Sequence, residues 1–193
     1  MAGRAKIVTI DLGPFMRDEG VVVGGAPTDD QLSTAAIIDS SCKEHGFVQV
    51  INFGLSPELQ ERAFEVAREL FSQPEGQKLD TLKPITPETN TGYAPYGKEN
   101  LNHSRPADLK EAYNIRRPEL KLNDFVGTPP TFEPTALKLW SVFERAAQRY
   151  ALACAVALGL EIDYFTRSLV RFDLCTLRML HYPPCDVPTP ENG

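Results

Sequence analysis

Hydrophobic and polar positions alternate along the chain with periods that predict strands and helices in turn. Segment 6–12 (KIVTIDL) is a short β-rich run closed by Gly13 and Pro14, and segment 47–53 (FVQVINF) alternates with the two-residue period of a strand. Between them, Thr28 precedes a run with helical spacing that ends at Gly46, a residue suited to a left-handed helix stop. The first third of the chain therefore predicts a strand, a helix and a second strand.

The pattern continues with longer helices. A second helix is predicted to start at Pro57, after a Ser56 cap, and to end before Pro74. The longest helical pattern runs from about 135 to 158, and DYFTRSL (163–169) is predicted as a short capped helix. CTLRMLHY (175–182) is predicted as the final strand. This order of elements indicates a mixed α/β domain.

A long irregular stretch interrupts the pattern between positions 83 and 105. It is rich in Pro, Gly, Asn and Thr, and it leads to DLKEAYNI (108–115), whose end is typical of a strand. Loops of this length inside a compact domain are more often functional than idle. An enzyme site built from this loop is therefore one hypothesis for the chain.

Composition and charge exclude several classes of function. With 42% hydrophobic and 24% charged residues, the 193-residue chain is an ordinary globular protein. Its net charge of -6 and the absence of a Lys/Arg stripe argue against a nucleic-acid partner. The apolar stretch 150–160 is too short to span a bilayer, and the first residues do not resemble a signal peptide. We therefore expect a cytoplasmic protein without a membrane segment.

Few residues suggest chemistry by spacing alone. The chain lacks GxGxxG, GxxxxGKS and GxSxG, and its four cysteines form no CxxC pair, which predicts separate reduced thiols. His45, His103 and His181 lie in no HxD, HxE, HxxxH or HExxH motif. His45 and Cys42 share a helix end, where a structural cluster is favoured over a catalytic pair. No metal-ligating or catalytic residue is predicted.

Five segments nevertheless resemble one family in the right order. IVTIDLG, HGFVQVINFGLSPELQERAFEVARELFSQP, TGYAPYGKENL, DLKEAYNI and LRMLHYPPCD are similar to the amino-terminal region of the isopenicillin N synthase-like dioxygenases. Those non-haem enzymes depend on iron(II) and 2-oxoglutarate. Phe53 departs from the family pattern, which usually has His at that position.

The resemblance implies a fold and a division of the chain. The family has a helical amino-terminal region with a long spine helix, followed by a double-stranded β-helix, or jelly-roll barrel. Residues 1–130 are then expected to form the amino-terminal domain. Residues 131–193 are expected to form the spine helix and the first strands of a barrel that is incomplete here.

The resemblance also implies cofactors that this chain lacks the means to hold. In the family an HxD pair and a distal His bind iron(II), and an Arg-x-Ser pair holds 2-oxoglutarate. Neither motif occurs here, and the family places HxD shortly after the YPP strand. We therefore expect iron(II) and 2-oxoglutarate in a longer parent protein, and no specific metal binding by these 193 residues.

Three residues are candidates for binding. By resemblance, Tyr182 occupies the place of a tyrosine that contacts 2-oxoglutarate, and the alternative is packing at a strand end. Arg178 lies four positions earlier on the same strand face and can line the same cavity, or face solvent. Tyr93 resembles an aromatic residue at the mouth of the substrate pocket, with loop packing as the alternative. Asp108, Lys110 and Glu111 are expected to be structural.

The resemblance favours the amino-terminal portion of an oxygenase that hydroxylates or desaturates a small organic molecule. The alternative is a non-catalytic, stand-alone module that lacks the metal site and binds a partner or nothing. Under the first hypothesis, the strand at 176–182 lacks its barrel partners, so the isolated chain is expected to aggregate or to bind the dye ANS strongly. The residues that set the substrate are not readable from this sequence.

Overall fold

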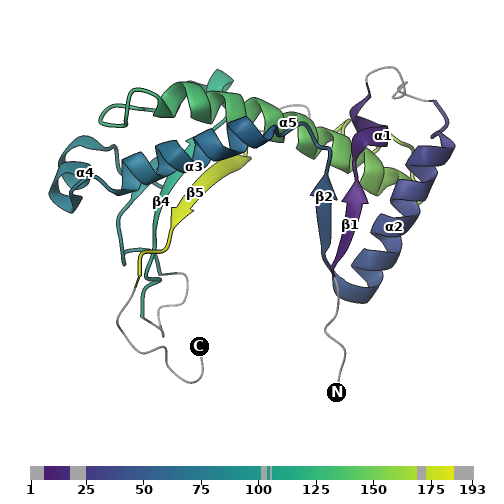
Figure 1. Ribbon diagram of the computed structural model, residues 1–193, viewed down its shortest axis with the longest axis horizontal. Coiled ribbons are helices and arrows are strands. Elements are labelled where there is room, and N and C mark those ends of the chain that lie inside the picture. The colour runs from purple at the N-terminus through teal and green to yellow at the C-terminus, as the bar shows by residue number, and fades with distance from the viewer. Residues whose placement is uncertain (1–6, 18–24, 101–103, 105, 169–172, 185–193) are drawn as a thin grey trace. The chain divides into compact units, whose positions relative to one another are not determined.

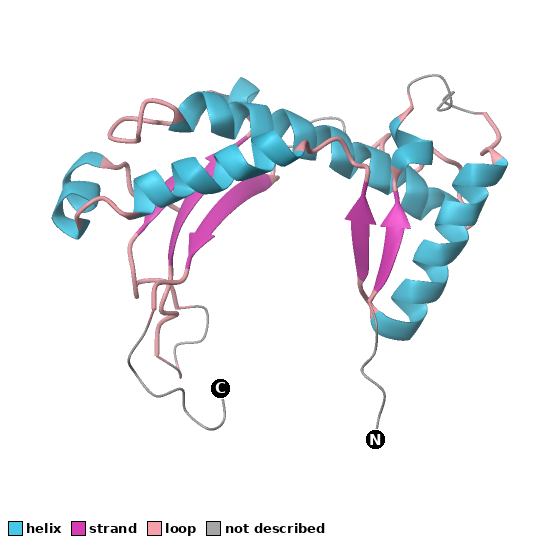
Figure 2. Ribbon diagram, viewed as in Figure 1, coloured by secondary structure: helices cyan, strands magenta, loops and turns pink. Residues whose placement is uncertain are grey.

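The computed structural model describes residues 7–17, 25–100, 104, 106–168 and 173–184. These residues form a mixed α/β structure, as the sequence predicts (Figures 1 and 2). In chain order the elements are β1 (Val8–Asp11), α1 (Gly13–Met16), α2 (Asp29–His45), β2 (Val48–Ile51), α3 (Pro57–Phe71), α4 (Glu75–Thr81), β3 (Gly92–Ala94), β4 (Glu111–Arg116), the 3-10 helix η2 (Pro118–Leu120), α5 (Phe132–Ala157) and β5 (Thr176–His181).

The chain divides into two compact units. The first comprises Met1–Pro57 and Ser141–Arg171, and the second comprises Glu58–Trp140 and Phe172–Gly193. Helix α5 contributes its first residues to the second unit and its remainder to the first. Each unit has its own cluster of buried apolar side chains.

The first unit is a two-stranded parallel sheet with helix α2 alongside (Figure 1). Strands β1 and β2 pair in register from Val8 opposite Val48. Thr28 and Gln31 cap α2 reciprocally, and Gly46 ends it with a φ of 72°. Both predicted ends of this helix are confirmed. The core is filled by side chains from β1, α1, α2 and α5, together with residues adjoining them, namely Ile10, Leu12, Phe15, Ile38, Leu152, Ala153 and Ile162.

The second unit is an antiparallel sheet of order β3-β4-β5. Side chains from α3 and from the first part of α5 pack against it. Its core contains Val66, Leu70, Phe71, Leu82, Tyr93, Tyr113, Ile115, Phe132, Ala136 and Trp140. The three residues from α5 recur every four positions, so one stripe of the helix is buried here.

The long helix starts earlier than its sequence pattern indicates. The sequence pattern predicts a start at about 135, whereas α5 begins at Phe132 and has Pro134 in its first turn. Proline is tolerated in the first turn of a helix, where its missing N–H has no helical partner. The buried Phe132 then anchors this end of the helix in the core.

Two further expectations are corrected. Residues 162–168 form turns rather than the predicted short helix, because i→i+3 bonds such as Tyr164 N to Glu161 O are not followed by a regular i→i+4 series. The stretch 83–105 is not a structureless loop, since it contains β3. At Gly92, φ is 102° and an added Cβ would lie 2.2 Å from the Lys83 carbonyl oxygen, so glycine is required there.

Candidate functional site

The candidate site is built on the three-stranded sheet of the second unit. The register places Glu111 opposite His181, Tyr113 opposite Met179, and Asn114 opposite Arg178. Since side chains alternate across a strand, odd-numbered residues of β4 and β5 lie on one face and even-numbered residues on the other. We call the first the core face, because Tyr113 and Ile115 belong to the hydrophobic core. The opposite one is called the outer face.

On the core face, one buried carboxylate collects three polar partners from three elements. Lys78 of α4 donates from Nζ to Glu111 Oε2 at 2.6 Å, and the hydroxyl of Tyr93 on β3 donates to the same oxygen at 2.5 Å. His181 Nδ1 lies 2.8 Å from Glu111 Oε1. Lys78 also donates to the Phe71 carbonyl oxygen at 2.8 Å. We call these four side chains, Glu111, Lys78, Tyr93 and His181, the Glu111 cluster.

The surroundings of Glu111 and Tyr93 shift the pKa values of both groups. Burial raises the pKa of Glu111, but hydrogen bonds from Lys78, Tyr93 and His181 and the charge of Lys78 outweigh it, so the pKa lies below its usual value. Burial, followed by the hydrogen bond to Glu111, raises the pKa of Tyr93. Tyr93 is therefore a neutral donor to an ionised carboxylate. An ionised carboxylate only accepts hydrogen bonds, so His181 carries its hydrogen on Nδ1.

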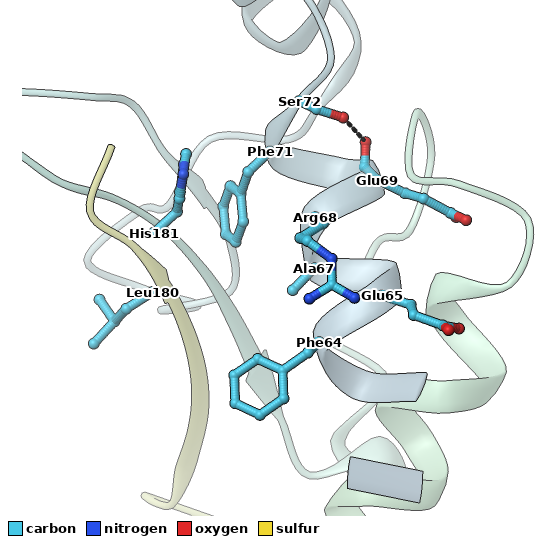
Figure 3. Close-up of a pocket in the computed structure, with 9 residues that line it drawn as sticks. All are labelled: Phe64, Glu65, Ala67, Arg68, Glu69, Phe71, Ser72, Leu180 and His181. Atoms are coloured by element: carbon cyan, nitrogen blue, oxygen red, sulfur yellow. Dashed lines mark hydrogen bonds between the residues drawn. The ribbon is translucent and has the colours of Figure 1, made fainter. Parts of the chain in front are cut away.

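A groove of about 760 Å³ lies beside this cluster, between α3 and β5 (Figure 3). Phe71 stacks on the His181 ring with centroids 5.4 Å apart, which forms one wall of the groove. Because β5 is at the edge of the sheet among the described strands, residues from both of its faces reach the groove. The lining residues are Phe64, Glu65, Ala67, Arg68, Glu69, Phe71, Ser72, Leu180 and His181.

The outer face ends in two exposed apolar side chains. Leu180 is 47% exposed and Tyr182, directly after β5, is 63% exposed. The two side chains lie on the same face, two residues apart, and are open to solvent in the described structure. Tyr182 and Leu180 therefore mark the accessible end of the outer face.

Arg178 lies on the same face, and its charge is already compensated. Its Nη2 donates to both carboxylate oxygens of Glu99, at 2.6 and 2.7 Å. Lys110 Nζ lies 3.2 Å from Glu99 Oε2 and 2.6 Å from Asp108 Oδ2. Burial raises the pKa of Glu99, but its hydrogen bonds and the two nearby cations lower it overall. We call Arg178, Glu99, Lys110 and Asp108 the Arg178 cluster.

Backbone hydrogen bonds hold Glu99 in place. The Gly97 N–H donates to the Lys110 carbonyl at 3.2 Å, and the Asp108 N–H donates to the Glu99 carbonyl at 3.0 Å. These bonds extend the pairing of β3 and β4 beyond the regular strands. The Glu99 carboxylate is therefore presented to Arg178 from a paired segment.

A layer of amides lies further along the outer face. Asn114 Nδ2 donates to Asn90 Oδ1 at 2.9 Å, and Asn90 Nδ2 donates to the Thr176 hydroxyl at 3.1 Å. Arg116 donates to the carbonyl oxygens of Thr89 and Asp173. Asn90 has a φ of 51°, a conformation in which asparagine is enriched. These bonds tie the segment before β3 to both β4 and β5.

The structure brings two of the three predicted binding residues to one face. Arg178 and Tyr182 share the outer face, although Arg178 forms an ion pair instead of facing solvent alone. Tyr93 lies on the core face and is 2% exposed. His45 ends α2 in the first unit, and His103 lies outside the described residues.

Sequence reasoning missed the partners of two acidic residues. The sequence predicts a structural role for Glu111, but no sequence pattern indicates its three partners. No sequence pattern indicates a role for Glu99. The nearest signal is the DLKE run, which places alternating acidic and basic residues at the start of β4. The partners themselves come from distant segments of the chain.

Within the described ranges, no three His, Cys, Asp or Glu side chains gather in a way that could hold a metal ion. The Glu111 cluster has one carboxylate and one imidazole, and its carboxylate is already bound by Lys78 and Tyr93. The described residues therefore do not fit a facial iron site. In the same part of the chain, no helix has the length and apolar character needed to cross a membrane.

The family model described as "non-haem dioxygenase in morphine synthesis N-terminal" matches residues 7–132. The chain belongs to this family. A curated relative, the 2-oxoglutarate-dependent dioxygenase citB of Monascus ruber, is 26% identical over 203 residues, covering 95% of this chain and 58% of the relative. The family resemblance predicted from the five sequence segments is thus confirmed.

Solved structures agree with this membership. A full-length Neurospora crassa protein in complex with alpha-KG is 26% identical, with a TM-score of 0.73 over 92% of this chain and 54% of that one. JOX2 in complex with 2OG, Fe and JA is 25% identical, with a TM-score of 0.70 over 93% of this chain and 48% of that one. This chain therefore spans about half the length of the relatives that it matches. The curated relatives include several 2-oxoglutarate-dependent dioxygenases.

Proposed function

We propose that these residues serve as the amino-terminal part of an iron(II)- and 2-oxoglutarate-dependent oxygenase that hydroxylates or desaturates a small organic molecule. The observation that carries this proposal is the outer face, where Leu180 and Tyr182 are exposed at the accessible end of β5 in a chain of this family. Solved relatives hold small molecules, for example thymine in one structure of the Neurospora crassa protein, which supports a substrate of that class.

In this proposal, residues 1–130 form the amino-terminal domain, and residues 131–193 contain the spine helix and the start of a jelly-roll barrel. Strand β5 would be a barrel strand. Two features of β5 support this assignment. Among the described strands it pairs only with β4, and the end of its outer face is uncovered by them. The spine helix corresponds to α5, which has 26 residues.

Among the described residues, Tyr182 is the one we assign to contact 2-oxoglutarate. Its phenol is an exposed hydrogen-bond donor, and carboxylates are strong acceptors. When bound with iron(II), 2-oxoglutarate supplies the electrons that reduce dioxygen. Tyr182 would orient the co-substrate through one carboxylate oxygen. The second predicted contact, Arg178, would first have to release Glu99.

No step through iron is derived from the described residues, because they offer no cluster of ligands. The iron ligands are expected in the longer oxygenase proposed above. We expect that the longest in-frame coding sequence containing these residues encodes an HxD pair and a distal His, the ligand types of a facial triad. Sequencing the transcript tests this directly.

The activity test uses the protein encoded by that full coding sequence. With iron(II), 2-oxoglutarate and dioxygen it should form succinate, and Tyr182→Phe should raise the KM for 2-oxoglutarate at least about tenfold, the loss of one hydrogen bond to a charged group. Tyr96→Phe is the matched control, because it removes a hydroxyl from the segment after β3. A transcript without HxD, or no succinate formation, would overturn the proposal.

A further inference from the structure

The Arg178 cluster bears on which molecules the outer face accepts. We propose that Glu99 sets the charge preference of this face: it neutralises Arg178, so that the part of a substrate lying against Arg178 is uncharged. This inference rests on the proposed function, since it concerns the substrate of the same face. It identifies Glu99 as a specificity-determining residue.

The contacts show that the charge of Arg178 is already matched within the chain. One guanidinium nitrogen donates to both oxygens of Glu99, and these are the lengths of charge-assisted hydrogen bonds. The second cation of the cluster, Lys110, is shared between Glu99 and Asp108. Two cations therefore face two carboxylates, and the cluster as a whole is neutral.

The backbone position of Glu99 keeps its carboxylate next to Arg178, so the charge of Arg178 is neutralised before any ligand binds. Backbone bonds at Gly97 and at Glu99 itself hold this segment against residues 108–110, which directly precede β4. A substrate carboxylate would have to displace an intramolecular carboxylate that is already held in position. Intramolecular groups compete at high effective concentration, so such a substrate is disfavoured.

Removing the Glu99 charge should make the outer face prefer an anionic ligand over a neutral one. Arg178 is only partly exposed, and its Nε is buried without a hydrogen-bond partner in the described part of the chain. A partly buried guanidinium without its counter-ion attracts an anion more strongly than one in bulk water. Without the Glu99 charge, Arg178 should therefore bind a carboxylate placed on the outer face.

The accessible neighbours define the chemical class of the ligand. Tyr182 and Leu180 lie on the same face as Arg178 and offer an aromatic ring, a hydroxyl and an aliphatic surface. A neutral, flat or partly apolar molecule fits these groups, and an organic acid bound through Arg178 does not. The co-substrate carboxylate then depends on Tyr182 for its contact with this chain.

The test compares two probes of nearly equal shape, benzoate and benzamide, by NMR titration of the protein encoded by the full coding sequence, without added iron(II) or 2-oxoglutarate. The wild-type chain should show no preference for benzoate. Glu99→Gln, which keeps the shape and removes the charge, should bind benzoate at least about tenfold more tightly than wild type does, equivalent to about 1.4 kcal/mol. Its affinity for benzamide should be unchanged.

Two controls assign the gain to Arg178. The double variant E99Q/R178Q should lose the gain in benzoate affinity. Asp108→Asn should not produce this gain, because within the cluster the Asp108 carboxylate contacts only Lys110. Circular dichroism confirms that each variant is folded. If E99Q does not fold, Glu99→Asp keeps the charge at a shorter reach and should show a smaller gain.

The proposal is overturned if wild type already prefers benzoate, if no Glu99 variant gains affinity, or if the gain survives in E99Q/R178Q. This experiment needs neither iron nor turnover of 2-oxoglutarate. Its failure is therefore distinguishable from failure of the oxygenase proposal, which the succinate assay decides.

Discussion

The two faces of the β3-β4-β5 sheet each contain a carboxylate that binds cations, but the two carboxylates are placed differently. Glu111 on the core face is 4% exposed and binds side chains from α4, β3 and β5. Glu99 reaches the outer face from a paired loop and binds Arg178 and Lys110 near solvent. The same functional group thus performs a structural task on one face and an electrostatic task on the other.

Burial explains the difference. A buried ion pair is costly to break, because the remaining partner stays in a poorly solvated position. A partly exposed pair such as Arg178–Glu99, with side chains 31% and 25% exposed, contributes less, because water partly replaces a lost partner. We therefore expect substitutions on the core face to lower stability more than substitutions on the outer face.

The largest effect is expected for Glu111→Ala. It leaves Lys78 buried without its carboxylate, which should lower the free energy of unfolding by about 3–5 kcal/mol. Urea unfolding followed by Trp140 fluorescence measures this, since the single tryptophan lies in the core of the second unit. Glu99→Ala is the control and should cost about 1 kcal/mol or less. Similar losses for both variants would contradict the contrast between the faces.

Removing apolar volume should give the next largest difference. Ile115→Ala creates a cavity in the core and should cost about 2–4 kcal/mol in the same unfolding assay. Leu180→Ala removes a side chain that is half-exposed on the outer face, and should change stability by about 0.5 kcal/mol or less. A large loss for Leu180→Ala would show that this side chain is covered in solution, and the outer face would then not be an accessible surface.

Two tyrosines allow stability and binding to be separated. Tyr93→Phe removes one hydrogen bond to an ionised carboxylate and should cost about 1.5 kcal/mol of stability. Tyr182→Phe should leave stability unchanged within about 0.5 kcal/mol, although it weakens co-substrate binding in the proposed enzyme. Thermal unfolding of both variants, measured side by side, tests the contrast. Equal destabilisation would mean that Tyr182 is also a packing residue.

The smallest effect concerns pH. The folded-state pKa of Glu111 lies below its usual value, so its stabilising contribution is complete above that usual value and is lost as the pH falls through the folded-state pKa. Between about pH 5 and about pH 3, the wild-type chain should therefore lose more stability than Glu111→Gln. Urea unfolding at a series of pH values gives the two slopes. Parallel slopes would exclude Glu111 as a source of the acid sensitivity.

Sequence patterns predicted most elements because the signals for them are local. Thr28 and Gly46 lie within a few residues of the groups that they cap, and α5 shows its buried stripe at a regular four-residue spacing. The stretch before β4 was harder, because β3 has three residues and is set by a glycine conformation that depends on Lys83. Short strands provide too few positions for a period to be recognised.

The candidate site was only partly predictable. The shared face of Arg178 and Tyr182 follows from strand alternation, which the sequence contains. The role of Glu111 does not, because its partners lie 33, 18 and 70 residues away. For Tyr93 the sequence left pocket and packing equally open. The register of β3 against β4 places its ring on the core face.

By itself, the sequence determined the family, the order of the main elements and the strand face that carries Tyr182. Tertiary structure alone decided which carboxylate is buried and which cation each one binds, as for Glu99 and Arg178, which are 79 residues apart. The physical reason is the range of the interactions. Caps and periodic apolar positions act over one or two turns of chain, whereas an ion pair between segments exists only after strand register and loop pairing have brought its two groups together.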